Sequence, residues 1–68
     1  MKARIVRGIS DSYIVKEAVE TVTGEKFLEV YEHEENGNEN FQGEWLCDID
    51  GTMNDTDEYL LNEIDAAI

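Results

Sequence analysis

The sequence predicts a small α+β domain in which a three-stranded, mainly antiparallel sheet is covered on one face by two amphipathic helices, in the order β-α-β-β-α. Two patterns in the 68 residues predict this fold. Apolar residues alternate with polar ones in three segments, and they recur at helical spacing in two others. No proline, repeat or linker divides the chain, so we expect residues 1–68 to form one acidic domain.

The first strand is expected over residues 2–9 and the first helix over residues 10–23. Ser10 or Asp11 can cap the helix, and Gly24 would end it. Its apolar stripe would consist of Ile14, Val15, Ala18, Val19 and Val22. Several of these side chains are β-branched and favour strands, so a hairpin through this stretch is the alternative.

Two further strands are expected over residues 26–34 and 41–50. Asn36 and Gly37 between them fit a type I′ turn, which predicts an antiparallel hairpin. The last helix would begin at Asp55 or Thr56. Its apolar stripe would consist of Leu60, Leu61, Ile64, Ala67 and Ile68.

Alternation along the strands also predicts which residues share a face of the sheet. The residues expected to face the helices are Ala3, Ile5, Ile9, Leu28, Val30, Trp45, Cys47 and Ile49. The opposite face would display Phe27, Glu29, Tyr31, His33, Glu44, Leu46, Asp48 and Asp50, together with Lys2, Arg4 and Val6. Trp45 is therefore expected in the core.

Charge is distributed very unevenly along the chain. Every Lys and Arg lies in residues 1–26, whereas thirteen of the seventeen carboxylates follow Lys26, and the net charge is −12. Such a surface repels nucleic acid and anionic membranes and suits a basic partner. We expect a cytoplasmic protein that binds neither nucleic acid nor membranes directly.

The residues that could carry catalysis are sparse. Cys47 is the single cysteine and is expected to be a buried small hydrophobe. His33 is the single histidine and is expected on the surface of the hairpin, beside several glutamates. No phosphate-binding loop or metal-binding motif is present. We therefore expect a protein that is not an enzyme and that uses no cofactor and no metal.

Two short resemblances involve the segment after residue 47. Asp48-Ile49-Asp50-Gly51-Thr52 resembles the first motif of haloacid-dehalogenase-type phosphatases, in which the two aspartates would be nucleophile and acid. That family needs a parallel sheet and later basic motifs, and no base follows Thr52.

Residues 48–61 also resemble a dockerin calcium loop, with Asp48, Asp50, Thr52 and Asp57 as ligands, although the second loop glycine and the partner repeat are missing. A strand that ends in a turn at Gly51 explains the same residues.

The expected outer sheet face is the best candidate for a binding site. Apolar and aromatic side chains rimmed by acids are typical of a protein-binding patch. The predicted partner-binding residues are Phe27, Glu29, Tyr31, Glu44, Leu46, Asp48 and Asp50. In size and charge the chain is similar to virus- or mobile-element-encoded DNA mimics and enzyme inhibitors, such as anti-restriction or anti-CRISPR proteins.

This resemblance implies an acidic binding protein that docks on a basic, nucleic-acid-binding surface of a partner protein. A small structural or assembly module that acts as a homodimer, through a sheet edge or the outer face, is the alternative.

Overall fold

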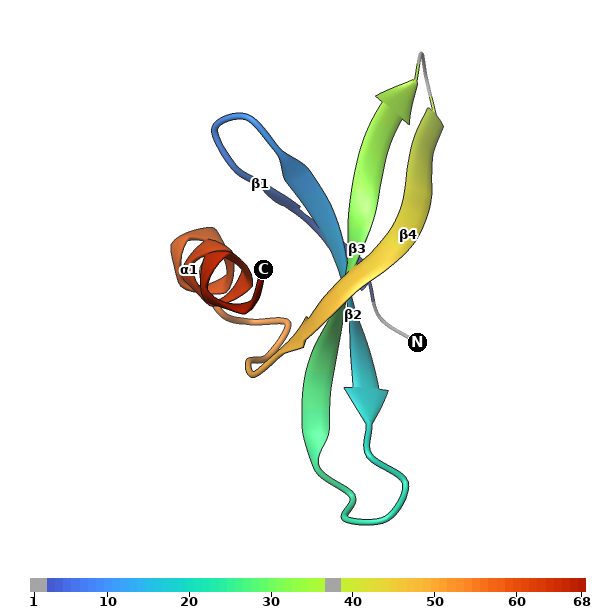
Figure 1. Ribbon diagram of the computed structural model, residues 1–68, viewed down its shortest axis with the longest axis vertical. Coiled ribbons are helices and arrows are strands. Elements are labelled where there is room, and N and C mark those ends of the chain that lie inside the picture. The colour runs from blue at the N-terminus through green and yellow to red at the C-terminus, as the bar shows by residue number, and fades with distance from the viewer. Residues whose placement is uncertain (1–2, 37–38) are drawn as a thin grey trace.

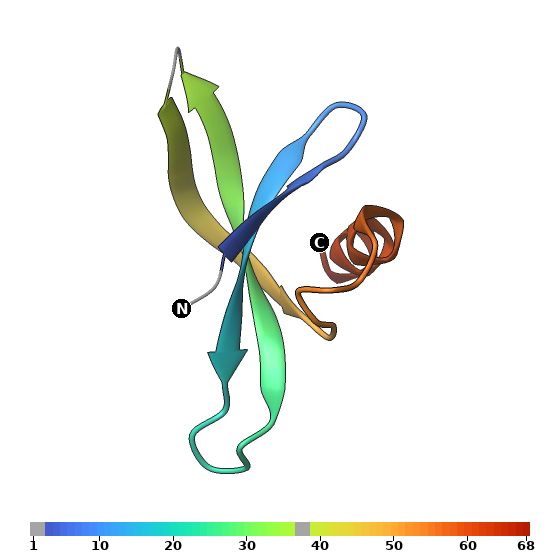
Figure 2. The ribbon, with the colours of Figure 1, turned by 180° about the vertical axis from the view of Figure 1, so that it is seen from behind.

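A computed structural model describes residues 3–36 and 39–68 of the chain. These residues form four strands and one helix (Figure 1): β1 (Ala3–Arg7), β2 (Ser12–Val19), β3 (Lys26–Asn36), β4 (Glu39–Ile49) and α1 (Asp57–Ala67). The strands are antiparallel and lie in the order β1-β2-β3-β4, so each pairs with its neighbour in sequence. In both views α1 lies on one side of the sheet, beside the β1–β2 hairpin (Figure 2).

The predicted three-stranded sheet with two helices is wrong, because the segment expected to be the first helix is strand β2. Ile14 and Val15 are adjacent apolar residues that point to opposite faces of the sheet, where Ile14 pairs with Ile5 and Val15 pairs with Arg4. A strand that is apolar on both faces has the same i, i+1, i+4 pattern as a helix stripe. The β-branched side chains favour the strand. Gly24, expected to end the helix, instead has a φ of 75° in the turn between β2 and β3.

The predicted hairpin of residues 26–34 and 41–50 is confirmed as β3 and β4. Strand β3 ends two residues later than expected, and β4 begins two residues earlier and ends one residue earlier. The predicted turn includes Gly37, which lies outside the described residues. The pairing shifts register between Val30 and Tyr31 and again between Tyr31 and His33. Val30 pairs with Cys47, yet the next residue, Tyr31, pairs with Trp45. This bulge turns Trp45 away from the face that Cys47 and Ile49 share.

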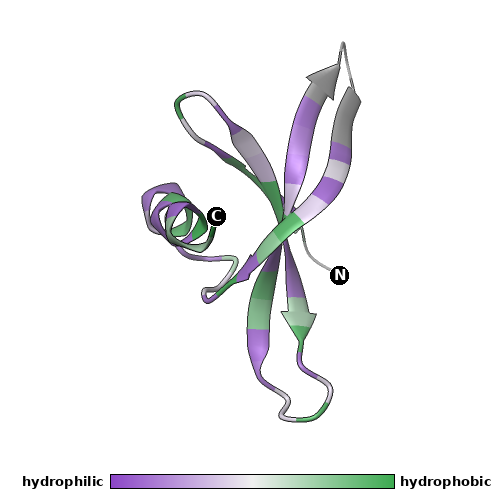
Figure 3. Ribbon diagram, viewed as in Figure 1, coloured by the Kyte–Doolittle hydropathy of each residue, from purple (hydrophilic) through white to green (hydrophobic). Residues whose placement is uncertain are grey.

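The core lies between the sheet and α1. It consists of Val6, Val15, Leu28, Val30, Cys47 and Ile49 from the sheet and Leu60 and Ile64 from the helix. The predicted core positions of Leu28, Val30, Cys47 and Ile49 are confirmed. Alternating hydrophobic and hydrophilic bands along the strands reflect the two faces (Figure 3).

The other predicted core residues of the sheet are misplaced. Trp45 is 53% exposed and Ile9 is fully exposed. In β1 the alternation is inverted, because Val6 is buried and Ala3 and Ile5 point away from the helix. Lys2, expected beside Val6, lies outside the described residues.

Helix α1 begins and packs largely as predicted. The Thr56 side chain caps it by accepting a hydrogen bond from the Tyr59 backbone N–H at 3.1 Å. Leu60 and Ile64 are buried, whereas Ala67 and Ile68, expected in the same stripe, are exposed at the end of the chain.

Arg4 fastens the start of α1 to the first strand. Its guanidinium donates to the backbone carbonyls of Met53 at 2.9 Å and Asp55 at 2.6 Å, and it pairs with the Asp57 carboxylate. Arg4 therefore lies on the face covered by the helix, and its predicted place on the opposite face is wrong. The inverted alternation of β1 brings its guanidinium to this turn.

Salt should stabilise this fold, because a net charge of −12 on 68 residues repels itself. Raising ionic strength from about 10 mM to about 0.15 M shortens the screening length from about 30 to about 8 Å. We expect the melting temperature to rise over this range, as measured by circular dichroism at fixed protein concentration. A melting temperature that falls would show that favourable ion pairs outweigh the repulsion.

Candidate functional site

The sheet face opposite α1, here called the outer face, is not covered by any other described element (Figures 1 and 2). Its residues follow from alternation with the buried core positions and from the strand register. They are Ala3, Ile5 and Arg7 of β1, Ser12, Ile14, Lys16 and Ala18 of β2, Phe27, Glu29, Tyr31 and His33 of β3, and Gln42, Trp45 and Asp48 of β4.

An apolar row crosses the outer face from one edge of the sheet to the other. Ile5 pairs with Ile14, Ile14 with Tyr31, and Tyr31 with Trp45. Neighbours in such a row lie about 5 Å apart, so their side chains form one continuous strip. The indole of Trp45, at the β4 end, is half exposed.

The adjoining row contains Ala3, Lys16, Glu29 and Asp48. Aromatic side chains orient both carboxylates: the Trp45 indole N–H donates to Asp48 at 2.9 Å, and the Tyr31 hydroxyl donates to Glu29 at 3.4 Å. Burial and then Glu29 raise the pKa of Tyr31, so its hydroxyl stays protonated and remains a donor. The Lys16 ammonium lies 5.2 Å from the centre of the Tyr31 ring.

Charge on the outer face is divided between its two halves. Arg7 and Lys16 lie on β1 and β2, where the face has no carboxylate, whereas Glu29 and Asp48 lie on β3 and β4. Two bases and two acids give this set of described residues a net charge of 2 − 2 = 0. The described part of the outer face is thus balanced in a strongly acidic protein.

The structure brings only part of the predicted binding site together. Phe27, Glu29, Tyr31 and Asp48 share the outer face. Leu46 packs against the core, on the side of the helix. The remaining two residues, Glu44 at the irregular part of β4 and Asp50 beyond its end, are exposed.

Ten of the fourteen outer-face residues were not among the predicted binding residues, and these include Ile5, Ile14, Lys16 and Trp45. Trp45 was missed because the alternation does not reveal the bulge. Ile14 and Lys16 were missed because β2 was predicted to be a helix. The β-branched pattern of residues 14–23 is the signal that could have revealed β2.

A second surface, here called the acidic side, is formed by the segment after β4. Residues 50–68 contain Asp50, Asp55, Asp57, Glu58, Glu63 and Asp65 and no Lys or Arg. Glu58, Asn62 and Asp65 are all exposed and lie on one stripe of α1, because they are spaced i, i+4, i+7. Where β4 ends beside α1, a shallow pocket of about 200 Å³ is lined by Asp48, Ile49, Asp50, Glu63, Ala66 and Ala67.

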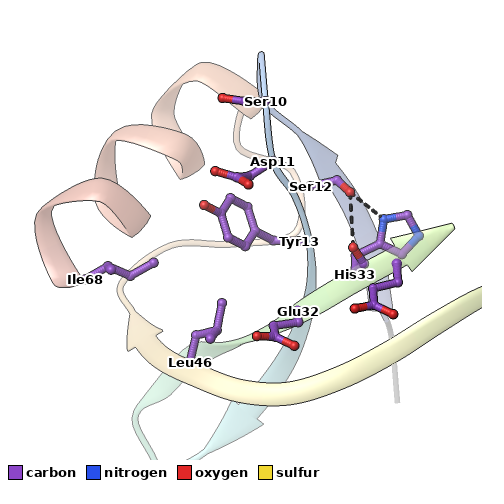
Figure 4. A pocket seen from close by; sticks show the side chains of 9 residues that line it. Ser10, Asp11, Ser12, Tyr13, Glu32, His33, Leu46 and Ile68 are labelled. Atoms are coloured by element: carbon purple, nitrogen blue, oxygen red, sulfur yellow. Dashed lines mark hydrogen bonds between the residues drawn. The ribbon is translucent and has the colours of Figure 1, made fainter.

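A pocket of about 450 Å³ lies where the β1–β2 and β3–β4 hairpins diverge (Figure 4). Tyr13, Leu46 and Ile68 line its apolar part, and Asp11 and Glu32 lie at its polar part. Burial, then Asp11 and Asp65, raise the pKa of Tyr13. Where the two hairpins diverge, the Ser12 hydroxyl of β2 lies 2.8 Å from Nδ1 of His33 in β3.

The predicted surface position of His33 is wrong, since the residue is only 7% exposed. Ser12 of β2 reaches it, and its Nε2 has no hydrogen-bond partner among the described residues. A catalytic serine needs a histidine that a third group orients. We interpret the Ser12–His33 contact as a structural contact that holds β2 and β3 together where the two hairpins begin to diverge.

The predicted burial of Cys47 is confirmed, and that burial raises the pKa of its thiol. A protonated buried thiol is a weak nucleophile. Three residues of the two short resemblances make other contacts. Asp48 accepts a hydrogen bond from the Trp45 indole N–H at 2.9 Å, the Thr52 backbone N–H donates to Asp55 at 2.7 Å, and Asp57 pairs with Arg4. Among the described residues, no three His, Cys, Asp or Glu side chains come together as a metal site.

Within the described part of the chain, no helix is long and apolar enough to span a membrane. In the comparisons with known proteins, no family model, curated protein or solved structure matches this chain.

Proposed function

We propose that this chain is a non-enzymatic acidic binding protein that docks on a basic, nucleic-acid-binding surface of a partner protein. The observation that carries the proposal is the acidic side, where six carboxylates occur in residues 50–68 and one of them, Asp57, is paired with Arg4. Arginine and lysine side chains that recognise phosphate also recognise carboxylate, because the two anions present similar acceptor oxygens. A rigid acidic surface is therefore able to occupy a phosphate-binding groove.

The acidic side has the geometry that such docking requires. Glu58 and Asp65 project from the same stripe of α1, about 10 Å apart along its axis at 1.5 Å per residue. Capping by Thr56 and the contacts of Arg4 fix the beginning of the helix, so the carboxylates are held in place before a partner arrives. Asp50 and Glu63 line the shallow pocket at the end of β4, on the other flank of α1 from Asp65, where a basic side chain would be partly desolvated.

The docking surface proposed here therefore differs from the one expected from the sequence. Glu29 and Asp48 share the outer face with Lys16 and Arg7, so that face is balanced rather than acidic. Only Asp48 and Asp50 of the predicted residues also border the shallow pocket of the acidic side.

Displacement of DNA from purified DNA-binding proteins tests this function. Each member of a panel is loaded with fluorescent duplex DNA, and the chain is titrated at low salt. We expect displacement from at least one member, with an apparent affinity that falls steeply as salt increases. The variant Glu58→Lys/Asp65→Lys should be at least about tenfold weaker, because two contacts become repulsive.

The matched control is Glu20→Lys/Glu25→Lys in the exposed turn between β2 and β3, which changes the net charge by the same amount. It should retain most of the activity. Equal losses from both variants would show that affinity follows bulk charge and that no docking surface exists. Failure to displace DNA from any panel member would contradict the proposal.

A further inference from the structure

We propose that the outer face is the interface of a homodimer, in which a second copy packs face to face about a twofold axis parallel to the strands. This proposal does not depend on the proposed function. The apolar row is not covered by another described element and ends in the half-exposed Trp45. Such a row is typical of a surface that binds another protein. A strongly basic partner fits this face poorly, because Arg7 and Lys16 would repel it.

The charge pattern of the outer face complements itself. A twofold axis along the strands places β1 over β4 of the second copy and β2 over β3. The basic half of one copy then faces the acidic half of the other. Each row of the face meets the same row in reverse order, and Lys16 lies opposite Glu29 of the second copy, twice per dimer.

The apolar row is self-complementary in the same arrangement. Ile14 faces Tyr31 of the second copy and Ile5 faces Trp45, so each aromatic side chain meets an aliphatic one. Two sheets that pack in this way keep their strands within about 30° of each other, as in β-sandwiches. The helices lie on the outside of the dimer, where the two acidic sides are farthest apart.

The dimer should be weak and should tighten with salt. The described outer face has fourteen residues, fewer than the 20–30 per partner of a standard interface. Two copies together also have a net charge of 2 × (−12) = −24, which opposes association. Screening this repulsion by raising salt from about 10 mM to about 0.15 M should lower the dissociation constant, the opposite of the dependence expected for a basic partner.

Two single charge reversals test the arrangement. Lys16→Glu places two carboxylates opposite each other in the homodimer, and Glu29→Lys places two ammonium groups opposite each other. Each variant alone should associate at least about tenfold more weakly than wild type. An equimolar mixture should form heterodimers as tightly as wild type, because each reversed residue then meets an opposite charge. Mass by analytical ultracentrifugation, and native mass spectrometry for the mixture, measure both outcomes.

The matched controls are Lys26→Glu and Glu58→Lys, which have the same net charges as the test variants but lie outside the outer face. Each control should self-associate like wild type, and their mixture should show no preference for the heterodimer. Circular dichroism checks that all variants fold, because Lys16 and Glu29 are also cross-strand neighbours within one chain. If a reversed variant does not fold, Trp45→Ala replaces it and should weaken association at least about tenfold.

Three outcomes would overturn the dimer. The first is a wild-type mass of 7.8 kDa up to about millimolar concentration at about 0.15 M salt. The second is undiminished self-association of the folded test variants or of Trp45→Ala. The third is a mixture of Lys16→Glu and Glu29→Lys that associates no better than either variant alone.

Discussion

Replacing Leu28 with alanine should remove a large part of the protein's stability. Leu28 is fully buried, lies in the central strand β3 and belongs to the cluster that packs against α1. Truncation of a buried leucine costs about 2–5 kcal/mol, because apolar contacts are lost and a cavity remains. At about 0.05–0.15 kcal/mol per residue, the 68 residues provide about 3–10 kcal/mol of stability, so this loss removes a large part of it.

Trp45→Ala is the informative comparison, since alternation in the sequence predicts a core tryptophan whose loss would be equally severe. The structure places Trp45 half exposed beside Tyr31, where its removal should cost only about 1 kcal/mol. Urea unfolding of both variants at low-micromolar concentration measures the difference. If Trp45→Ala proves as destabilising as Leu28→Ala, the bulge and the composition of the outer face are wrong.

Removing the guanidinium of Arg4 should also have a large effect. Arg4→Met keeps the apolar stem of the side chain but loses two hydrogen bonds to carbonyls and the ion pair with Asp57. We expect a loss of about 2–3 kcal/mol, because hydrogen bonds to charged groups are stronger than neutral ones. Arg4→Lys should recover only part of it, since an ammonium cannot reproduce the fork of the guanidinium.

Lys26→Met serves as the control for Arg4→Met, because it removes one positive charge at an exposed site. Chemical denaturation of the two variants under identical salt isolates the effect of the contacts from that of net charge. Equal stabilities would show that Arg4 does not hold the start of α1. Asp57→Asn should be milder than Arg4→Met, because both carbonyl contacts persist.

Local patterns predicted those parts of the fold whose geometry is set locally. The alternation of residues 26–34 and 41–50 and the cap at Thr56 identified the hairpin and the last helix. The pattern failed at β2, where a strand apolar on both faces imitates a helix stripe. It also failed at Trp45, because nothing in the perfect alternation from Phe41 to Ile49 reveals a bulge.

The candidate sites were harder to predict because they depend on pairings between distant residues. Arg4 contacts Asp57 across 53 positions, and no local signal connects them. The balance of charge on the outer face required the position of β2, since Lys16 and Glu29 become neighbours only once β2 pairs with β3. The excess of acids after residue 50 was visible from composition, but the distribution of these acids over both flanks of α1 was not.

The position of α1 after all four strands has a consequence for biosynthesis. The four strands follow one another as a meander, whose mostly local pairings can form within milliseconds to seconds. The helix that covers Val6 and Leu28 is translated after all four strands. A chain that stops before residue 57 would leave the apolar helix face of the sheet uncovered, so it would be a substrate for chaperones or proteases rather than a smaller version of this protein.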